Sequence, residues 1–218
     1  MENNVEQKSP IPWQNRSSIG FFKAMWETIK YALFKPNEFF DNLTIEKSIK
    51  GPYLFYFILS SCGGIIAIAI SMLIKPVDAG PLVFIFASVL MIIFSSFGLF
   101  VGTGILHLGV MLLRGTGGYK GTLNVLAYSA SSNIFQIVPF IGGFISGTWG
   151  IVIGVKGFKR VHNFSTAKAI LAYFNIFIIV FIIGLLAAIA IPNILKARTD
   201  AKNNAAVKTI AQTVSTNP

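Results

Sequence analysis

The most informative absence in this sequence is that of acidic residues from its middle. The chain has eight Asp and Glu residues, and none of them lies between Ala79 and Thr199. Only 12% of its 218 residues are charged, whereas soluble domains carry roughly 25%. An ionised carboxylate is costly inside a bilayer, so the gap indicates membrane burial. The 54% hydrophobic content supports the same class, a polytopic integral membrane protein.

Metal-ligating and nucleophilic residues are also scarce, with one cysteine and two histidines in the whole chain. Cys62 lies in an apolar run and is predicted to be a small buried side chain. His107 lies in another apolar run, and His162 follows a basic segment. The Gly-rich stretch Arg114–Gly118 lacks the Lys-Ser/Thr pair of a phosphate loop and is predicted to be a turn. We therefore predict no catalytic residue, no metal, no cofactor and no enzymatic activity.

The apolar runs predict an all-α bundle that crosses the membrane five times. A helix needs roughly 20 apolar residues to cross. A tight turn at Pro139–Gly143 is expected to separate the third span from the fourth, and Pro192 is expected to end the fifth. A shallow re-entrant hairpin over Gly121–Val155 is the alternative to two helices that cross. The five predicted spans are about 52–74, 82–113, 121–138, 143–158 and 167–191.

The N-terminal region is too polar to cross a bilayer. Residues 1–18 are predicted to form a disordered tail, and residues 19–50 two amphipathic helices at the cytoplasmic interface. Apolar residues recur at helical spacing before Pro36, which is expected to end the first helix. The alternative is a core-facing helix of a small soluble cap. The candidate interfacial anchors are Phe22, Trp26, Phe39 and Phe40.

The distribution of Lys and Arg predicts a cytoplasmic N-terminus. Seven basic residues precede the first span, and the loops on that side of a five-span chain are the basic ones. Four further basic residues lie in 193–218, a polar tail that is helical at first and falls outside in this topology. A four-span chain would place the tail inside. The expected location is a bacterial inner membrane.

The predicted third span is the most polar of the five. Its polar side chains either line a cavity or hydrogen-bond between helices. If they line a cavity, the alternative function is that of a small transporter or channel component. The candidate polar face consists of Asn124, Ser129, Ser132, Asn133 and Gln136.

Several segments, in this order, resemble the bacterial branch of the Yip domain family. They are Trp26 to Phe40 with its W, P and FF residues, Gly104–Leu113, the GTGGYKGT loop, Ala127–Ser129, and Trp149–Gly157 followed by FKRVHNFSTAKA. The resemblance covers about residues 20–175. It implies a five-helix membrane fold with a cytoplasmic N-terminus, whose eukaryotic members bind Rab-type GTPases.

A second resemblance covers residues 178–202, which look like the N-terminal helix of type IV pilins. The likeness is greatest at Gly184–Asn193. The prepilin cleavage junction would fall between Ile170 and Leu171, and the family's glutamate position is Asn175. Because neither the required glycine nor the glutamate is present, we expect no prepilin processing.

The expected function is that of a non-enzymatic membrane scaffold or adaptor of the Yip type. Its expected partners are the lipid bilayer, a membrane or cytoplasmic protein, and further copies of the chain. The net charge of +10 favours anionic lipid headgroups, and no nucleic-acid partner is expected.

Overall fold

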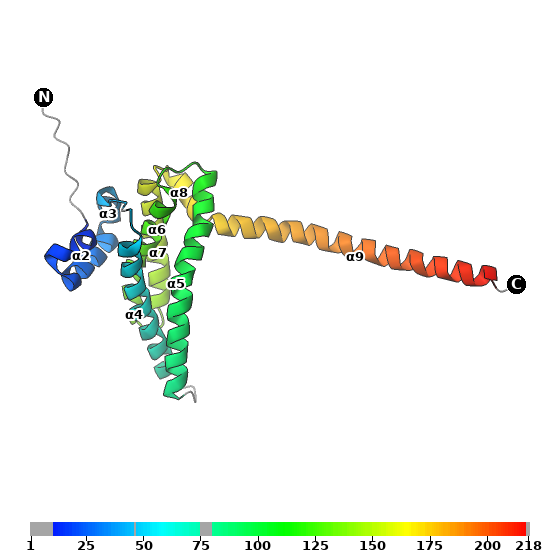
Figure 1. Cartoon of the computed structure of the whole chain (residues 1–218), viewed down its shortest axis with the longest axis horizontal. Coiled ribbons are helices and arrows are strands. Elements are labelled where there is room, and N and C mark those ends of the chain that lie inside the picture. The colour runs from blue at the N-terminus through cyan, green and yellow to red at the C-terminus, as the bar shows by residue number, and fades with distance from the viewer. Residues whose placement is uncertain (1–10, 46, 75–79, 217–218) are drawn as a thin grey trace, which may run out of the picture. The chain divides into compact units, whose positions relative to one another are not determined.

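All the secondary structure that the computed structural model describes is helical, over residues 11–45, 47–74 and 80–216. The chain divides into two compact units, Met1–Asn175 and Ile176–Pro218 (Figure 1). The predicted all-α class is therefore confirmed for the described residues.

The N-terminal segment is ordered from Ile11 onward, so the prediction of a disordered tail is wrong for residues 11–18. Residues 1–10 lie outside the described residues. Trp13 is fully buried, and its indole Nε1–H donates to the carbonyl oxygen of Gly51 over 2.8 Å. Its backbone N–H donates to Thr28 Oγ1 over 2.8 Å. The elements here are η1 (Pro12–Asn15), α1 (Arg16–Ile19), α2 (Phe21–Phe34) and α3 (Pro36–Asn42).

The first unit contains two long apolar helices. They are α4 (Lys50–Ile74) and α5 (Pro81–Leu112), which contact each other and run side by side in Figure 1. Both are long and apolar enough to cross a membrane. Their bounds match the first two predicted spans, and residues 75–79 between them lie outside the described residues. Cys62 is exposed on α4 rather than buried as predicted, and it lines a small hollow between α4 and η2.

The expected third span is not one α-helix. It consists of α6 (Gly118–Ser129) and a 3-10 helix, η2 (Ala130–Ile137), before a turn leads into α7 (Gly142–Val161). At 1.5 Å per residue in an α-helix and about 2.0 Å in a 3-10 helix, α6 and η2 together extend about 34 Å. Although irregular, this pair is as long as the hydrocarbon core is thick, roughly 30 Å.

The expected fifth span also differs. It is interrupted at Phe174, which separates α8 (Thr166–Tyr173) from α9 (Asn175–Thr216). Pro192 lies inside α9 and does not end it, although proline removes one backbone hydrogen bond from a helix. The third helix with the length and composition of a membrane span is Val180–Asn204, which lies within α9.

A line of aromatic rings connects the N-terminal segment to the bundle. The ring of Trp13 lies 5.4 Å from that of Phe55, which lies 5.1 Å from that of Tyr128. Tyr128 in turn meets Phe39 at 5.2 Å, and Phe39 meets Phe40 at 5.1 Å. We call these five residues the aromatic line. It packs η1, α4, α6 and α3 into one hydrophobic core.

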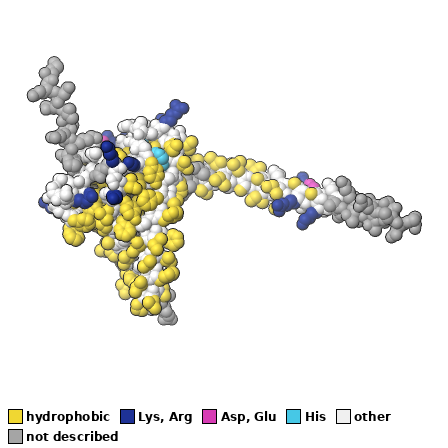
Figure 2. All heavy atoms as spheres, in the orientation of Figure 1, with side chains coloured by type: hydrophobic (Ala, Val, Ile, Leu, Met, Phe, Trp, Pro, Cys, Tyr) yellow, Lys and Arg dark blue, Asp and Glu magenta, His cyan; other side chains and the backbone are white. Residues whose placement is uncertain are grey.

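Charged and apolar side chains occupy different parts of the first unit. In Figure 2, Lys and Arg gather around the N-terminal helices and the neighbouring end of the bundle, while hydrophobic side chains cover the rest of the bundle visible in this view. Many of these apolar side chains are exposed, among them Phe86, Phe94 and Phe97 of α5. A soluble protein rarely exposes so extended an apolar surface, so lipid covers this one.

Two adjacent glycines at the turn between η2 and α7 allow a matched pair of substitutions. A Cβ at Gly142 would clash with the backbone carbonyl oxygen of Phe135, whereas nothing lies within 4 Å of a Cβ at Gly143. We expect Gly142→Ala to lower the thermal unfolding temperature of the detergent-purified protein. Gly143→Ala should leave it unchanged or raise it slightly, because alanine favours a helix by roughly 1 kcal/mol over glycine. Equal temperatures for the two variants would contradict this packing of the turn.

Candidate functional site

The four predicted interfacial anchors divide into two exposed and two buried residues. The side chains of Phe22 and Trp26 are 84% and 51% exposed, as expected of anchors. Phe39 and Phe40 are buried at 0% and 4% exposure, so the prediction that they are anchors is wrong. They face the protein because α3 packs on α7, where Gly157 leaves room for the ring of Phe40.

Polar side chains meet between α4, η2 and α7 in an otherwise apolar bundle. Asn133 donates to Ser60 Oγ of α4 through Nδ2, and its Oδ1 accepts from Gln136 Nε2 and from the Ser146 hydroxyl of α7. Each of these three distances is 3.2 Å. We call Ser60, Asn133, Gln136 and Ser146 the polar cluster. It joins three elements through the amide of one side chain.

The structure also shows where the remaining residues of the predicted polar face lie. Ser129 and Ser132 are buried and donate to backbone carbonyl oxygens of their own segment. Both line the same hollow as Asn133 and Gln136. Asn124 does not line it, and its Nδ2 donates instead to the carbonyl oxygen of Lys120. The structure thus brings four of the five predicted residues to one place.

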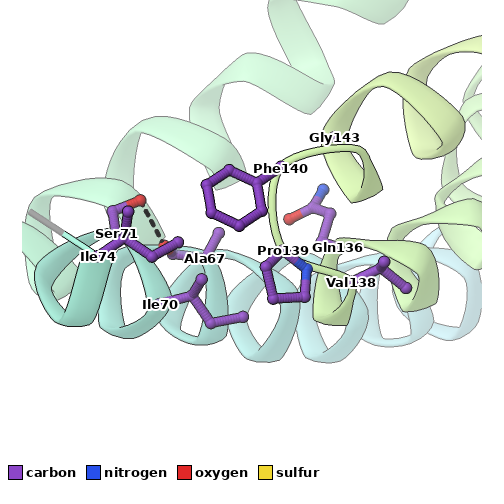
Figure 3. Close-up of a pocket in the computed structure, with 9 residues that line it drawn as sticks. All are labelled: Ala67, Ile70, Ser71, Ile74, Gln136, Val138, Pro139, Phe140 and Gly143. Atoms are coloured by element: carbon purple, nitrogen blue, oxygen red, sulfur yellow. Dashed lines mark hydrogen bonds between the residues drawn. The ribbon is translucent and has the colours of Figure 1, made fainter.

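Two hollows lie beside the polar cluster. One, of about 360 Å³, lies between α4, η2 and α7. The other, of about 450 Å³, lies at the turn before α7. Figure 3 shows the second, where Pro139 and Phe140 of the turn face Ala67 and Ser71 of α4. The turn therefore reaches the last third of α4.

Two histidines and a threonine meet at the charged end of the bundle, and two of them, Thr122 and His162, are buried. The Nδ1 atom of His162 accepts a hydrogen bond from the backbone N–H of Gly117 over 3.2 Å. Its Nε2 lies 3.1 Å from Thr122 Oγ1, which lies 2.9 Å from His107 Nδ1. Because Nδ1 of His162 is an acceptor, the proton of the neutral ring is on Nε2 and points to Thr122. We call these three residues the histidine cluster.

The histidine cluster fixes the Gly-rich loop to the end of α7. His162 is only 1% exposed, and burial, followed by the nearby charge of His107, lowers its pKa to about 4. A Cβ at Gly117 would lie 2.6 Å from the carbonyl oxygen of Val161 and 2.7 Å from His162 Nδ1. The loop therefore needs glycine at this position in order to donate its N–H to the imidazole.

The sequence model of the Yip1 domain family matches residues 30–190, about three quarters of the chain. The chain belongs to the Yip1 domain family. No curated protein and no solved structure matches it.

Membership of the Yip1 domain family and the three apolar helices identify a multi-pass membrane protein whose helices contact the lipid bilayer. The match includes the Gly-rich loop and the end of α7, two of the segments that carried the resemblance in the sequence. The likeness of Gly184–Asn193 to pilin helices has no such support and stays a resemblance.

The sequence did not reveal the histidine cluster. Its members are separated by 15 and 40 residues along the chain, and a lone histidine in an apolar run carries no sign of its partner. The glycines around residues 115–121 were the available signal. In the sequence these glycines predict a turn. That they also let the loop approach an imidazole is seen only in the structure.

The pKa of His162 predicts an acid-dependent loss of stability. The pKa is about 4 in the folded protein and about 6.5 in a model peptide, so the unfolded chain takes up a proton first. The stabilisation is complete above pH 6.5 and is lost as the pH falls toward 4; its upper limit is about 3 kcal/mol.

The test is thermal unfolding of detergent-purified protein between pH 4 and pH 8. His162→Asn keeps an acceptor for the Gly117 N–H but does not titrate in this range. We expect its unfolding temperature to fall less than that of the wild type below pH 6.5. Parallel pH profiles for the two proteins would show that His162 does not contribute.

Proposed function

We propose that this Yip1-family protein is a non-enzymatic scaffold or adaptor that binds a cytoplasmic protein at the membrane surface. The observation that carries the proposal is a hollow of about 520 Å³ between η1, α2 and α3. Side chains of both charges line it beside aromatic ones. These are Glu27, Lys30, Tyr31, Phe34, Lys35 and Glu38.

The charges in this hollow are available to a partner. Lys30 pairs with Glu27 at 2.8 Å and Lys35 with Glu38 at 3.2 Å, and all four side chains are 41–63% exposed. Exposed pairs of this kind contribute at most about 1 kcal/mol each, so exchanging them for pairs with a partner costs little. Phe34 is 75% exposed beside them, and an aromatic side chain of this kind is a common binding anchor.

The hollow is held rigidly, which suits a docking surface. Trp13 and the two hydrogen bonds from its indole and backbone fix η1 to α2 and α4. The Trp149 indole of α7 donates to the carbonyl oxygen of Leu33 near the end of α2 over 3.1 Å. Deletion of residues 1–50 would remove part of the core, so point substitutions are the sharper test.

The exposed side of α2 supports an interfacial position for these helices. Phe22 and Trp26 have few protein neighbours, and the ammonium of Lys30 lies 5.9 Å from the centre of the Trp26 ring. Aromatic side chains with lysines beside them are typical of a membrane interface. In this arrangement α2 contacts lipid through Phe22 and Trp26 and leaves the hollow open to the cytoplasm.

An exchange of charges within the hollow tests partner binding. Full-length tagged protein is purified from its native membrane in mild detergent, and the proteins that accompany it are identified and quantified. Because Lys35→Glu with Glu38→Lys keeps the net charge and the ion pair but reverses its direction, we expect partner recovery to fall at least tenfold. Lys23→Glu, on α2 but outside the hollow, is the control. Unchanged recovery with the exchange, or purification of a homo-oligomer with lipid alone, would contradict the adaptor function.

We propose further that the chain crosses a bacterial inner membrane five times, with its N-terminus in the cytoplasm. The length of α6 with η2 supports a third crossing, and the 20 residues of α7, about 30 Å, support a fourth. The gathering of Lys and Arg at the end of the bundle near α2 and α3 supports the orientation.

Cysteine labelling in intact cells tests this topology. In a Cys62→Ser background, we expect a membrane-impermeant maleimide to label Gly80→Cys and Lys202→Cys. Lys168→Cys, on the opposite side in this topology, should react only after permeabilisation. If Lys202→Cys is protected while Gly80→Cys is labelled, the chain crosses the membrane an even number of times.

A further inference from the structure

The hollow beside the polar cluster has an unusual lining for a membrane protein. Its volume is about 360 Å³, and hydroxyl and amide side chains from α4, η2 and α7 line it. None of the described residues that line it carries a charge. Three of them are glycines on one face of α7, namely Gly143, Gly147 and Gly150.

These glycines open the hollow toward the surface of the bundle. Gly143 and Gly147 are exposed, and a Cβ at either position would have no atom within 4 Å. The space beside α7 exists because these positions carry no side chain. The hollow is therefore a groove that opens sideways from the bundle, and we call it the lateral groove.

The lateral groove lies at hydrocarbon depth. Ser60 is ten residues into α4 from Lys50, which places it about 15 Å along that helix. This is half the thickness of a hydrocarbon core of roughly 30 Å. Polar groups at such a depth need partners, since lipid chains offer none. A molecule that enters the groove from the side comes from the bilayer.

The lining selects the chemistry of that molecule. Serine hydroxyls and the amides of Asn133 and Gln136 both donate and accept hydrogen bonds, as alcohols do. A phosphate or an ammonium would lose its hydration here without an opposite charge to replace it, at a cost of several kcal/mol. A lipid whose head consists only of hydroxyl and ester groups pays no such penalty. A volume of 360 Å³ equals that of roughly ten waters, which is sufficient for a glycerol head.

We propose that the lateral groove binds the uncharged head of a diacylglycerol-type lipid, which enters sideways from the bilayer. The hydroxyl of the lipid hydrogen-bonds to the polar cluster, and its chains remain in the hydrocarbon beside α7. This site is separate from the protein-binding hollow formed by η1, α2 and α3, and it does not depend on the adaptor function.

Thermal unfolding in detergent with added dioctanoylglycerol tests the proposal. We expect the lipid to raise the unfolding temperature in proportion to the logarithm of its concentration above the Kd, by roughly 5 °C at about 100 times its Kd. Gly147→Leu fills the groove and should abolish this shift. The matched control is Gly98→Leu, an exposed glycine of α5 with no atom within 4 Å of its Cβ, and it should keep the full shift.

A second variant covers the case in which Gly147→Leu fails to fold. Gln136→Leu keeps much of the side-chain volume but removes the amide, and we expect it to reduce the shift by at least half. Native mass spectrometry should show one bound dioctanoylglycerol on the wild type and on Gly98→Leu, and a several-fold weaker adduct on Gln136→Leu.

Three results would overturn the proposal. The absence of any shift with the wild type would mean that water alone occupies the groove. Equal shifts in all variants would mean that the lipid acts by dissolving in the detergent. A larger groove-dependent shift with dioctanoyl phosphatidic acid, which has the same chains but a charged head, would show that the site selects anionic lipids.

Discussion

Edge contacts between aromatic rings join segments that are far apart in the sequence, and the rest of the first unit depends on them. The aromatic line connects Trp13 with Phe55, Tyr128 and Phe39 at ring distances of 5.1–5.4 Å. Each such pair contributes about 0.5–1.5 kcal/mol beyond the burial of its surface. The Gly-bearing face of α7 lets Phe40 close this core at Gly157. Without the line, η1 and α3 would have no fixed position on the bundle, and the hollow between them would not form.

The bundle itself is held by a different kind of contact. Lipid chains are as apolar as the helix surfaces, so burial of apolar area does not drive these helices together. Hydrogen bonds from Asn133 hold the elements together instead, because its amide bonds to Ser60 of α4 and to Ser146 of α7. The same bonds favour a structural role of the polar cluster over a transport pathway. At the charged end, His162 fixes the Gly-rich loop in a similar way.

The sequence predicted the bounds of α4 and α5 well, but it predicted poorly which of their neighbours are buried against protein. The bounds of α4 and α5 follow from hydrophobic length and from the flanking polar residues, which are local properties. Phe22 and Phe39 look equivalent in the sequence, yet one is 84% exposed and the other fully buried. Apolar composition predicts that a side chain leaves water, but it does not distinguish lipid from protein as the destination. The composition of residues 1–18 likewise predicts a disordered tail around Trp13. The partner that orders this residue, Gly51, lies 38 residues away and leaves no local signal.

The irregular third segment bears on the proposal of five crossings, because length and composition alone do not identify it as a span. By those criteria three helices qualify as spans, and α6 and η2 do not, because α6 has only 12 residues and η2 only 8. Yet Ser129 bonds to its own backbone, and Asn133 bonds to α4 and to α7, so these two side chains need no water. The 3-10 geometry of η2 rises more per residue than an α-helix, which lets a short segment reach the far end of α4. The polarity that makes this segment look unsuited to a bilayer is therefore what specifies its position within the bundle.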